Sequence, residues 1–90
     1  MDVQRMLPLL ARVAREARSG TDVELKDVAY WSRISEATIS RFENGKIRTW
    51  PTTLDAIIGG YAKALEREPA WFWLRAAELM HENTGPPVAA

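Results

Sequence analysis

The chain has 90 residues, of which 47% are hydrophobic and 27% charged, and its basic and acidic side chains cancel to a formal net charge of zero. A chain this short forms one small domain, whose core holds a few helices rather than a roomy enzyme cleft. It contains no cysteine, which excludes a disulfide scaffold, a cysteine nucleophile and a thiolate zinc site, and which fits a reducing, cytoplasmic environment.

The first predicted helix ends at Ser19-Gly20. Its apolar residues recur at steps of three and four, the period of an amphipathic helix: Val3, Met6, Leu7, Leu10, Val13, Ala14 and Ala17. Pro8 interrupts this pattern because proline lacks an amide hydrogen and clashes with the preceding turn. The helix therefore either begins near Leu7 or kinks at Pro8. Because Pro8 and Arg12 break the apolar run, we expect neither a signal peptide nor a membrane span.

The next two predicted helices are short and are separated by a break at Arg33-Ile34. The segment 21–24 begins with threonine and ends with glutamate, the pattern of a capping box that opens a helix. The inner face of that helix consists of Leu25, Val28, Ala29 and Ser32. Ser35 is a suitable N-cap for a third helix, which Asn44-Gly45 ends, so this helix covers about residues 35–44.

Two further helices follow a loop over residues 46–50. Pro51 suits the first position of a fourth helix, with an apolar stripe of Leu54, Ile57, Ile58, Tyr61 and Leu65. Gly59-Gly60 weakens this helix by about 1 kcal/mol per glycine. Two adjacent glycines inside a helix indicate a close approach to another helix. A fifth helix, opened by Pro69, runs from Ala70 to about Met80. No segment alternates as a strand does, so we predict an all-α bundle of about five helices over residues 1–82, with a disordered tail over 83–90.

The segment 25–45, LKDVAYWSRISEATISRFENG, resembles the helix-turn-helix of the phage repressor and Cro family. The matching positions include a small residue where the two helices cross, an apolar residue after the turn and two inward residues of the recognition helix; they are Ala29, Ile34, Ile39 and Phe42. The similarity extends to residues 62–65 (AKAL) and to Trp71. Two positions depart from the family pattern: Arg33 replaces the usual glycine of the turn, and Leu25 replaces a polar residue that often contacts phosphate.

This resemblance implies a compact, repressor-like helical domain that binds duplex DNA as a homodimer and regulates transcription. It implies an ion pair between Arg18, late in the first helix, and Glu43. It also implies a protein of the bacterial cytoplasm that associates with the nucleoid and uses no cofactor, membrane or small-molecule substrate.

A helical wheel of residues 35–44 separates an inner from an outer face. Thr38, Ile39 and Phe42 share one side, and the other side consists of Glu36, Ala37, Ser40, Arg41 and Asn44. This outer face is slim and polar, which suits a major groove about 12 Å wide. We expect contacts to base edges from Arg41, Glu36, Ala37 and Ser40. Arg41 fits a guanine edge, Glu36 a cytosine amino group and Ala37 a thymine methyl group.

A second set of side chains is expected to contact phosphates: Arg33, Thr38, Asn44, Lys46 and Arg48. Residues 1–50 carry nine basic and seven acidic side chains, and residues 51–90 carry three and five. Attraction to DNA must therefore be local. Two alternatives stay open: Glu36 serves only the helix dipole, or Lys46 and Arg48 are ordinary loop charges.

The start of the fifth helix, AWFWL, is apolar nearly all round. Trp71, Leu74 and Glu78 share one stripe, and Trp73, Ala77 and Met80 share another. An exposed apolar patch of this size usually marks an interface. We expect a homodimer interface formed by Phe72, Trp73, Ala77 and Met80; the alternative is that these aromatic side chains cover the domain's own surface.

The sequence offers little chemistry for an enzyme or a metal site. Glu78, His81 and Glu82 have the spacing of metal ligands on a helix, but they lie at its end and lack a fourth ligand. No nucleophile–base pair is visible. The rival to a DNA-binding regulator is a protein-interaction module, such as a helix-turn-helix antitoxin, which the neutral charge and four tryptophans would suit.

Overall fold

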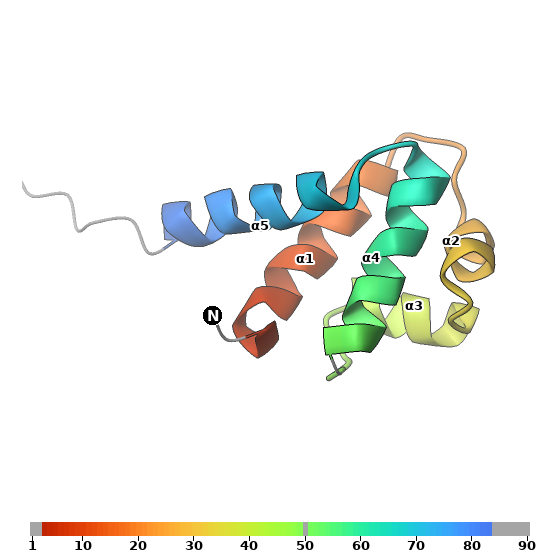
Figure 1. Ribbon diagram of the computed structural model, residues 1–90, viewed down its shortest axis with the longest axis horizontal. Helices are drawn as coiled ribbons and strands as arrows, with labels where there is room; N and C mark the ends of the chain where they lie inside the picture. The colour runs from red at the N-terminus through yellow and green to blue at the C-terminus, as the bar shows by residue number, and fades with distance from the viewer. Residues whose placement is uncertain (1–2, 50, 84–90) are drawn as a thin grey trace, which may run out of the picture.

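The computed structural model describes residues 3–49 and 51–83. They form the helices α1 (Val3–Arg18), α2 (Leu25–Ser32), α3 (Glu36–Glu43), α4 (Pro51–Leu65) and α5 (Pro69–Asn83) (Figure 1). No strand occurs in this part of the chain, so the predicted all-α class is confirmed. Within these ranges, no helix combines the length and apolar character needed to cross a bilayer.

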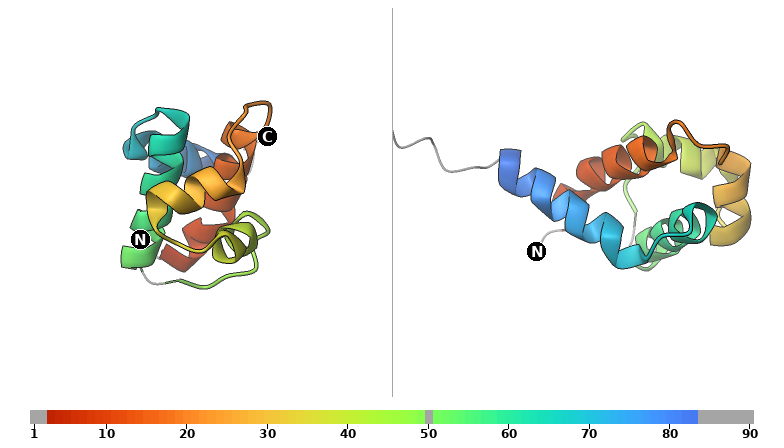
Figure 2. Two further views of the ribbon diagram at one scale, coloured as in Figure 1. Left: turned by 90° about the vertical axis from the view of Figure 1, so that its right-hand side faces the viewer. Right: turned by 90° about the horizontal axis from the view of Figure 1, so that it is seen from above.

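The bundle is organised around α4. This helix packs most extensively against α2 and also contacts α1 and α5, while α3 lies against α1 and α2. Seen from the side in Figure 2, α2 crosses in front of α4, and α3 lies below it. Both figures place α2 and the C-terminal half of α5 at opposite ends of the molecule. The molecule therefore has two distant helical ends joined by one core.

Helix α1 continues through Pro8, so a helix that begins only near Leu7 is wrong. The proline lies on the exposed side, whereas Met6, Leu7 and Leu10 are buried. Burying each of those side chains contributes about 1.5–3 kcal/mol. Together they outweigh the roughly 3 kcal/mol that a proline inside a helix costs.

Helix α2 begins later than the threonine-based capping box predicts. Its N-cap is Glu24, and the Asp27 carboxylate accepts a hydrogen bond from the Glu24 amide at 2.8 Å. Thr21 instead stabilises the preceding turn, where its hydroxyl donates to the Arg18 carbonyl and accepts from the Val23 amide. The capping box therefore forms three residues later than predicted. Glu24 takes the N-cap position and Asp27 the acidic position three residues after it.

The turn between α2 and α3 keeps the shape that glycine usually permits. Arg33 adopts a left-handed conformation with φ 61°, and its amide donates to the Ala29 carbonyl at 2.9 Å. Such a conformation costs a non-glycine residue about 1–2 kcal/mol. The Ser32 hydroxyl supports the turn by accepting a hydrogen bond from the Ile34 amide at 3.1 Å.

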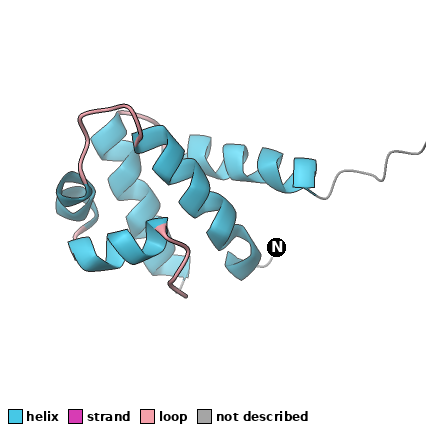
Figure 3. Cartoon of the chain, turned by 180° about the vertical axis from the view of Figure 1, so that it is seen from behind, coloured by secondary structure: helices cyan, strands magenta, loops and turns pink. Residues whose placement is uncertain are grey.

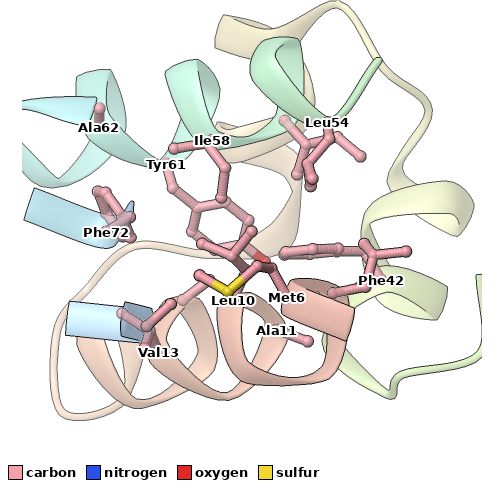
Figure 4. Close-up of a cluster of buried hydrophobic side chains, with 14 of the residues drawn as sticks. Met6, Leu10, Ala11, Val13, Phe42, Leu54, Ile58, Tyr61, Ala62 and Phe72 are labelled. Carbon is pink, nitrogen blue, oxygen red and sulfur yellow. The ribbon is translucent and has the colours of Figure 1, made fainter. Parts of the chain in front are cut away.

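The core surrounds a row of three aromatic rings contributed by α3, α4 and α5. The Tyr61 ring centroid lies 5.9 Å from that of Phe42 and 6.3 Å from that of Phe72. Figure 4 shows the Tyr61 and Phe42 rings beside the α1 side chains Met6 and Leu10. Phe72 is fully buried, so its predicted place in a dimer interface is wrong.

The inner face of α5 consists of Phe72, Ala76 and Leu79, which recur at helical spacing. Leu74 is 65% exposed, so the stripe formed by Trp71, Leu74 and Glu78 is not the one that faces the core. The helix also continues to Asn83, which moves the boundary expected at residue 82. The rest of the expected tail, residues 84–90, lies outside the described residues.

Gly60 lies where α4 crosses α2. A Cβ atom at Gly60 would lie 2.6 Å from the Ser32 Cβ and 2.9 Å from the Val28 carbonyl oxygen. At the neighbouring Gly59, a Cβ atom would meet nothing within 4 Å. The close approach predicted from the glycine pair is therefore confirmed, and Gly60 alone accounts for it.

We predict that Gly60→Ala and Gly59→Ala change stability in opposite directions. Gly60→Ala should lower the free energy of unfolding by about 1–3 kcal/mol, because the new methyl group overpacks the crossing. Gly59→Ala should raise it by about 0.5–1 kcal/mol through helix propensity alone. Urea denaturation followed by circular dichroism measures both, and a loss of equal size in the two variants would contradict the crossing geometry.

Candidate nucleic-acid interface

Helix α3 is fixed to the bundle by its inner face. Ile39 and Phe42 are fully buried, and Glu43 at the end of the helix is also buried. An ionised carboxylate is costly to bury unless it is paired and hydrogen-bonded. The partners of Glu43 therefore decide how firmly α3 is held.

Arg18 of α1 and Tyr61 of α4 are these partners. Arg18 binds the carboxylate in a bidentate manner, with Nε 2.7 Å from Oε2 and Nη2 2.9 Å from Oε1. The Tyr61 hydroxyl donates a second hydrogen bond to Oε2. Arg18 also donates to the Val23 carbonyl at 3.2 Å. The structure thus forms the Arg18–Glu43 pair that the resemblance implies and adds Tyr61 to it.

The pairing determines the ionisation of Glu43. Burial by itself would raise the pKa of the carboxyl group, but the hydrogen bonds from Arg18 and Tyr61, together with the charges of Arg18 and Arg15, outweigh it and hold the pKa of Glu43 below its usual value. Burial and the adjacent carboxylate raise the pKa of the Tyr61 phenol. The carboxylate therefore remains ionised and Tyr61 remains a hydrogen-bond donor.

Hydroxyl groups organise the beginning of α3. The Ser35 side chain accepts a hydrogen bond from the Thr38 amide at 3.2 Å, which confirms Ser35 as the N-cap. Its own hydroxyl donates to Thr38 Oγ1 at 2.8 Å. Thr38 is half-buried, so its hydroxyl contributes first to the shape of the helix end.

The outer face of α3 is exposed along its length. Glu36, Ala37 and Arg41 are exposed, and Ser40 is half-buried on the same side. Among the described residues, the Arg41 side chain forms no hydrogen bond or ion pair. The Asn44 side chain donates to the Ser40 carbonyl at 2.8 Å and so closes the end of the helix. The four side chains predicted to contact bases therefore lie together on one slim surface.

Exposed cations flank α3 at both ends. Arg33 precedes it, and Lys46 and Arg48 follow it on the loop to α4. This loop is attached to α1, because Gln4 Nε2 donates to the Thr49 carbonyl at 3.1 Å and Ile47 packs against the core. Figure 3 shows the loop and the first turn of α1 along the same edge of the molecule. The two loop cations therefore extend from a fixed segment beside the exposed face of α3.

The backbone amides at the end of α3 are already used. The amides of Asn44, Gly45 and Lys46 donate to the carbonyls of Ser40, Phe42 and Arg41 respectively. A phosphate at this end of the helix would therefore have to be bound by side chains: Lys46, Arg48 and the second amide hydrogen of Asn44 Nδ2, whose first hydrogen is bonded to the Ser40 carbonyl.

A helix-turn-helix domain model matches residues 9–72, more than half of the chain. The chain belongs to the helix-turn-helix domain family. The matched segment contains the whole of α2, α3 and α4, the Arg18–Glu43–Tyr61 cluster and the turn at Arg33. A comparison with curated proteins finds none that matches this sequence.

In helix-turn-helix domains that bind DNA, the second helix of the motif docks in the major groove; α3 holds that place in the motif of this chain. Among residues 3–49 and 51–83, no group of three or more metal-ligating side chains gathers. Glu78 instead forms an ion pair with Arg75 at 2.8 Å. The exposed α3 surface is thus the main candidate for function.

Two features of this helix-turn-helix domain were missed from the sequence. The Tyr61 hydroxyl was counted only as part of an apolar stripe, although a buried tyrosine usually finds a hydrogen-bond partner. Tyr30 and Trp31, at 73% and 49% exposed, were given no role. A helical wheel of α2 with Val28 and Ser32 on the inner side would have placed both aromatic side chains on the outer side.

We predict that the Arg18–Glu43 pair makes stability depend on pH. Since the folded pKa of Glu43 lies below its unfolded value, its contribution is present above the usual glutamate range and is lost as pH falls through the folded pKa. Glu43→Gln should cost about 3 kcal/mol at neutral pH and flatten the loss of stability on acidification. Urea denaturation between about pH 7 and pH 3 measures both effects.

The matched control is Glu16→Gln, which breaks the exposed Arg12–Glu16 pair at 3.1 Å. This change should cost less than about 1 kcal/mol. If the two variants lost equal stability, Glu43 would not be the residue that fixes α3.

Proposed function

We propose that the protein is a sequence-specific transcriptional regulator that binds duplex DNA as a homodimer with α3 in the major groove. The observation that carries this proposal is the outer face of α3, where Glu36, Ala37 and Arg41 are exposed while the inner face is fixed by the Glu43 pairing. A regulator of this kind, similar to Cro or a short repressor, would act on DNA in the cytoplasm at the nucleoid.

The recognition residues have distinct roles in this proposal. Arg41 binds a guanine edge through two parallel hydrogen bonds, Glu36 accepts from a cytosine amino group and Ala37 contacts a thymine methyl group. Ser40 lies between Ala37 and Arg41 on the same face and completes the base contacts. A helix end closed by its own hydrogen bonds, as at Ser35 and Asn44, holds these side chains in register.

Phosphate contacts supply affinity and position the helix. Arg33, Lys46 and Arg48 are exposed on either side of α3, where the two strands that border a groove would lie. Asn44 and Thr38 contribute polar side chains at the ends of the helix. Because the net charge is zero, this local group of cations must supply most of the electrostatic attraction.

The proposed dimer interface is the outer side of α5. With Phe72 assigned to the core, the interface consists of Trp73, Leu74, Ala77 and Met80. Leu74 and Ala77 are exposed, and Trp73 and Met80 are half-buried. A two-fold contact needs only one such patch on each chain. Pairing through α5 would set the separation of two half-sites at about 34–36 Å.

The second candidate function is a protein-interaction module, such as a helix-turn-helix antitoxin that binds a partner protein. One observation favours it: Tyr30 and Trp31 are exposed on α2, away from the outer face of α3. Loss of DNA affinity with rising salt supports the first function. Absence of duplex binding at about 50 mM salt, or binding without salt dependence, would support the second.

We predict that Arg41→Ala and Lys46→Ala affect DNA binding in different ways. Arg41→Ala should weaken the preferred site by about 1–3 kcal/mol and relax one base preference. Lys46→Ala should weaken all sequences alike and reduce the salt slope by about one. Binding-site selection on random duplexes, followed by titration at several salt concentrations, measures both. A changed preferred sequence in Lys46→Ala alone would reverse the two roles.

We predict that Trp73→Glu lowers dimer affinity and DNA affinity together while the chain remains helical. A buried unpaired charge at a two-fold contact occurs twice and is strongly unfavourable. Analytical ultracentrifugation beside the parent protein measures the dimer, and Trp31→Glu, at the other end of the molecule, is the control. A parent protein that is monomeric at high micromolar concentration would refute this interface.

A further inference from the structure

Three large hydrophobic side chains are exposed in the described part of the chain, and two of them are neighbours on α2. Tyr30 is 73% exposed and Trp31 49%, whereas the third, Leu74, lies on α5. The Tyr30 and Trp31 rings meet edge to face, with centroids 5.0 Å apart and planes at 84°. An aromatic pair that is already ordered loses little side-chain entropy on binding, which is one reason why such residues anchor protein interfaces.

Two cations adjoin these rings, and together the four side chains form the aromatic–basic patch: Tyr30, Trp31, Arg33 and Lys63. They line a pocket of about 340 Å³. The Lys63 ammonium lies 5.6 Å from the Trp31 ring centroid. Within residues 3–49 and 51–83, neither Arg33 nor Lys63 forms an ion pair. Both charges are therefore available to an acidic partner.

The aromatic–basic patch shares Arg33 with the proposed phosphate contacts, but its other three residues, Tyr30, Trp31 and Lys63, belong to neither of the two surfaces assigned above. Trp31 and Lys63 connect the end of α2 with the end of α4, and Figures 1 and 2 place this region at the opposite end from the outer half of α5. A dimer formed through α5 leaves it uncovered. It also lies beside α2 rather than on the outer face of α3, so occupation of α3 by DNA leaves Trp31 accessible.

We propose that the aromatic–basic patch is a docking site for a protein segment that presents carboxylate side chains beside a proline or aromatic side chain. The carboxylates pair with Arg33 and Lys63, and the apolar side chain packs on the open faces of Tyr30 and Trp31. Charge complementarity selects this partner, because a basic segment would be repelled by the same two cations. The small pocket accepts one or two side chains, so the contact is weak and transient.

This docking function goes beyond the proposed DNA binding and does not rest on it. A DNA backbone would also be attracted by Arg33 and Lys63. It offers no apolar side chain to pack on the open faces of Tyr30 and Trp31, since phosphate contacts need only cations and donors. An acidic protein segment uses all four side chains of the patch, and for this reason it is the favoured occupant.

The test is a titration of the full-length, isotope-labelled protein with synthetic octapeptides, followed by nuclear magnetic resonance. The probe peptide carries four glutamates around a central Pro-Phe; one control carries lysines in place of the glutamates, and another carries Gly-Gly in place of Pro-Phe. The probe should shift the Trp31 indole resonance and bind at least tenfold more tightly than either control. No shift of Trp31 at millimolar probe would overturn the proposal.

Variants then separate the patch from the rest of the surface. Tyr30→Ser with Trp31→Ser should weaken the probe at least tenfold, whereas Ala70→Ser, at an exposed apolar position outside both the patch and the proposed dimer interface, should leave its affinity unchanged. Arg33→Glu with Lys63→Glu, both at exposed positions, should reverse the preference so that the lysine peptide binds more tightly. This reversal tests the proposal even if the serine variant fails to fold.

Duplex binding of the serine double variant distinguishes this proposal from the DNA-binding function. Unchanged DNA affinity with lost probe binding supports a separate docking site. A tenfold loss of DNA affinity without any probe binding in the parent would make the patch a DNA contact and overturn the proposal. A loss of dimerisation in the same variant would make it a self-interface, with the same consequence.

Discussion

The buried carboxylate of Glu43 is the group on which the geometry of this domain depends. It receives hydrogen bonds from α1 through Arg18 and from α4 through Tyr61, and it belongs to the last residue of α3. Three helices therefore meet at one charge. Removing any single partner would leave a buried ion or donor unsatisfied, which is costlier than the pair's net contribution. The position of α3, and with it that of its exposed outer face, is thus fixed by buried groups.

Two further features of the backbone, the helix crossing at Gly60 and the turn at Arg33, also determine where α3 lies. The crossing at Gly60 brings α2 and α4 close enough for Val28 to be fully buried, and the left-handed Arg33 directs the chain from α2 into α3. Packing fixes one side of α3, and hydrogen-bonded caps fix its two ends. On the outer side, Glu36, Ala37 and Arg41 are exposed, so folding places few constraints on these residues. A strained arginine in the turn is tolerable because the buried residues on either side determine the path of the backbone.

Much of this organisation could be predicted from the sequence, because the signals are local. The periodicity of the apolar residues located every helix, Ser35 and Asn44 marked the ends of α3, and the glycine pair indicated a close crossing.

The errors in the prediction arose where two local signals competed. At the start of α2, residues 21–24 and 24–27 both form a capping pattern, and tertiary packing chose the second. The start of α5 is apolar on all sides, so its sequence does not show which side faces the core. Only the tertiary contact with Tyr61 places Phe72 in the core. The role of the Tyr61 hydroxyl also needed the fold, since Glu43 is 18 residues away in sequence. The roles of the α3 side chains toward DNA and of α5 toward a second chain remain predictions.

The separation of α2 from the outer half of α5 has a consequence for assembly. If two chains pair through α5, their Tyr30 and Trp31 side chains lie at the two outermost tips of the pair, facing in opposite directions. Each dimer would then be bivalent, with two equal and weak contacts that one small monovalent partner cannot occupy at the same time. A partner that carries two suitable segments on a long enough linker, or two partners held side by side, would instead gain from the raised effective concentration of the second contact. Discrimination between partners would rest on avidity. The dimer would respond to the clustering of partner segments rather than to the concentration of single segments.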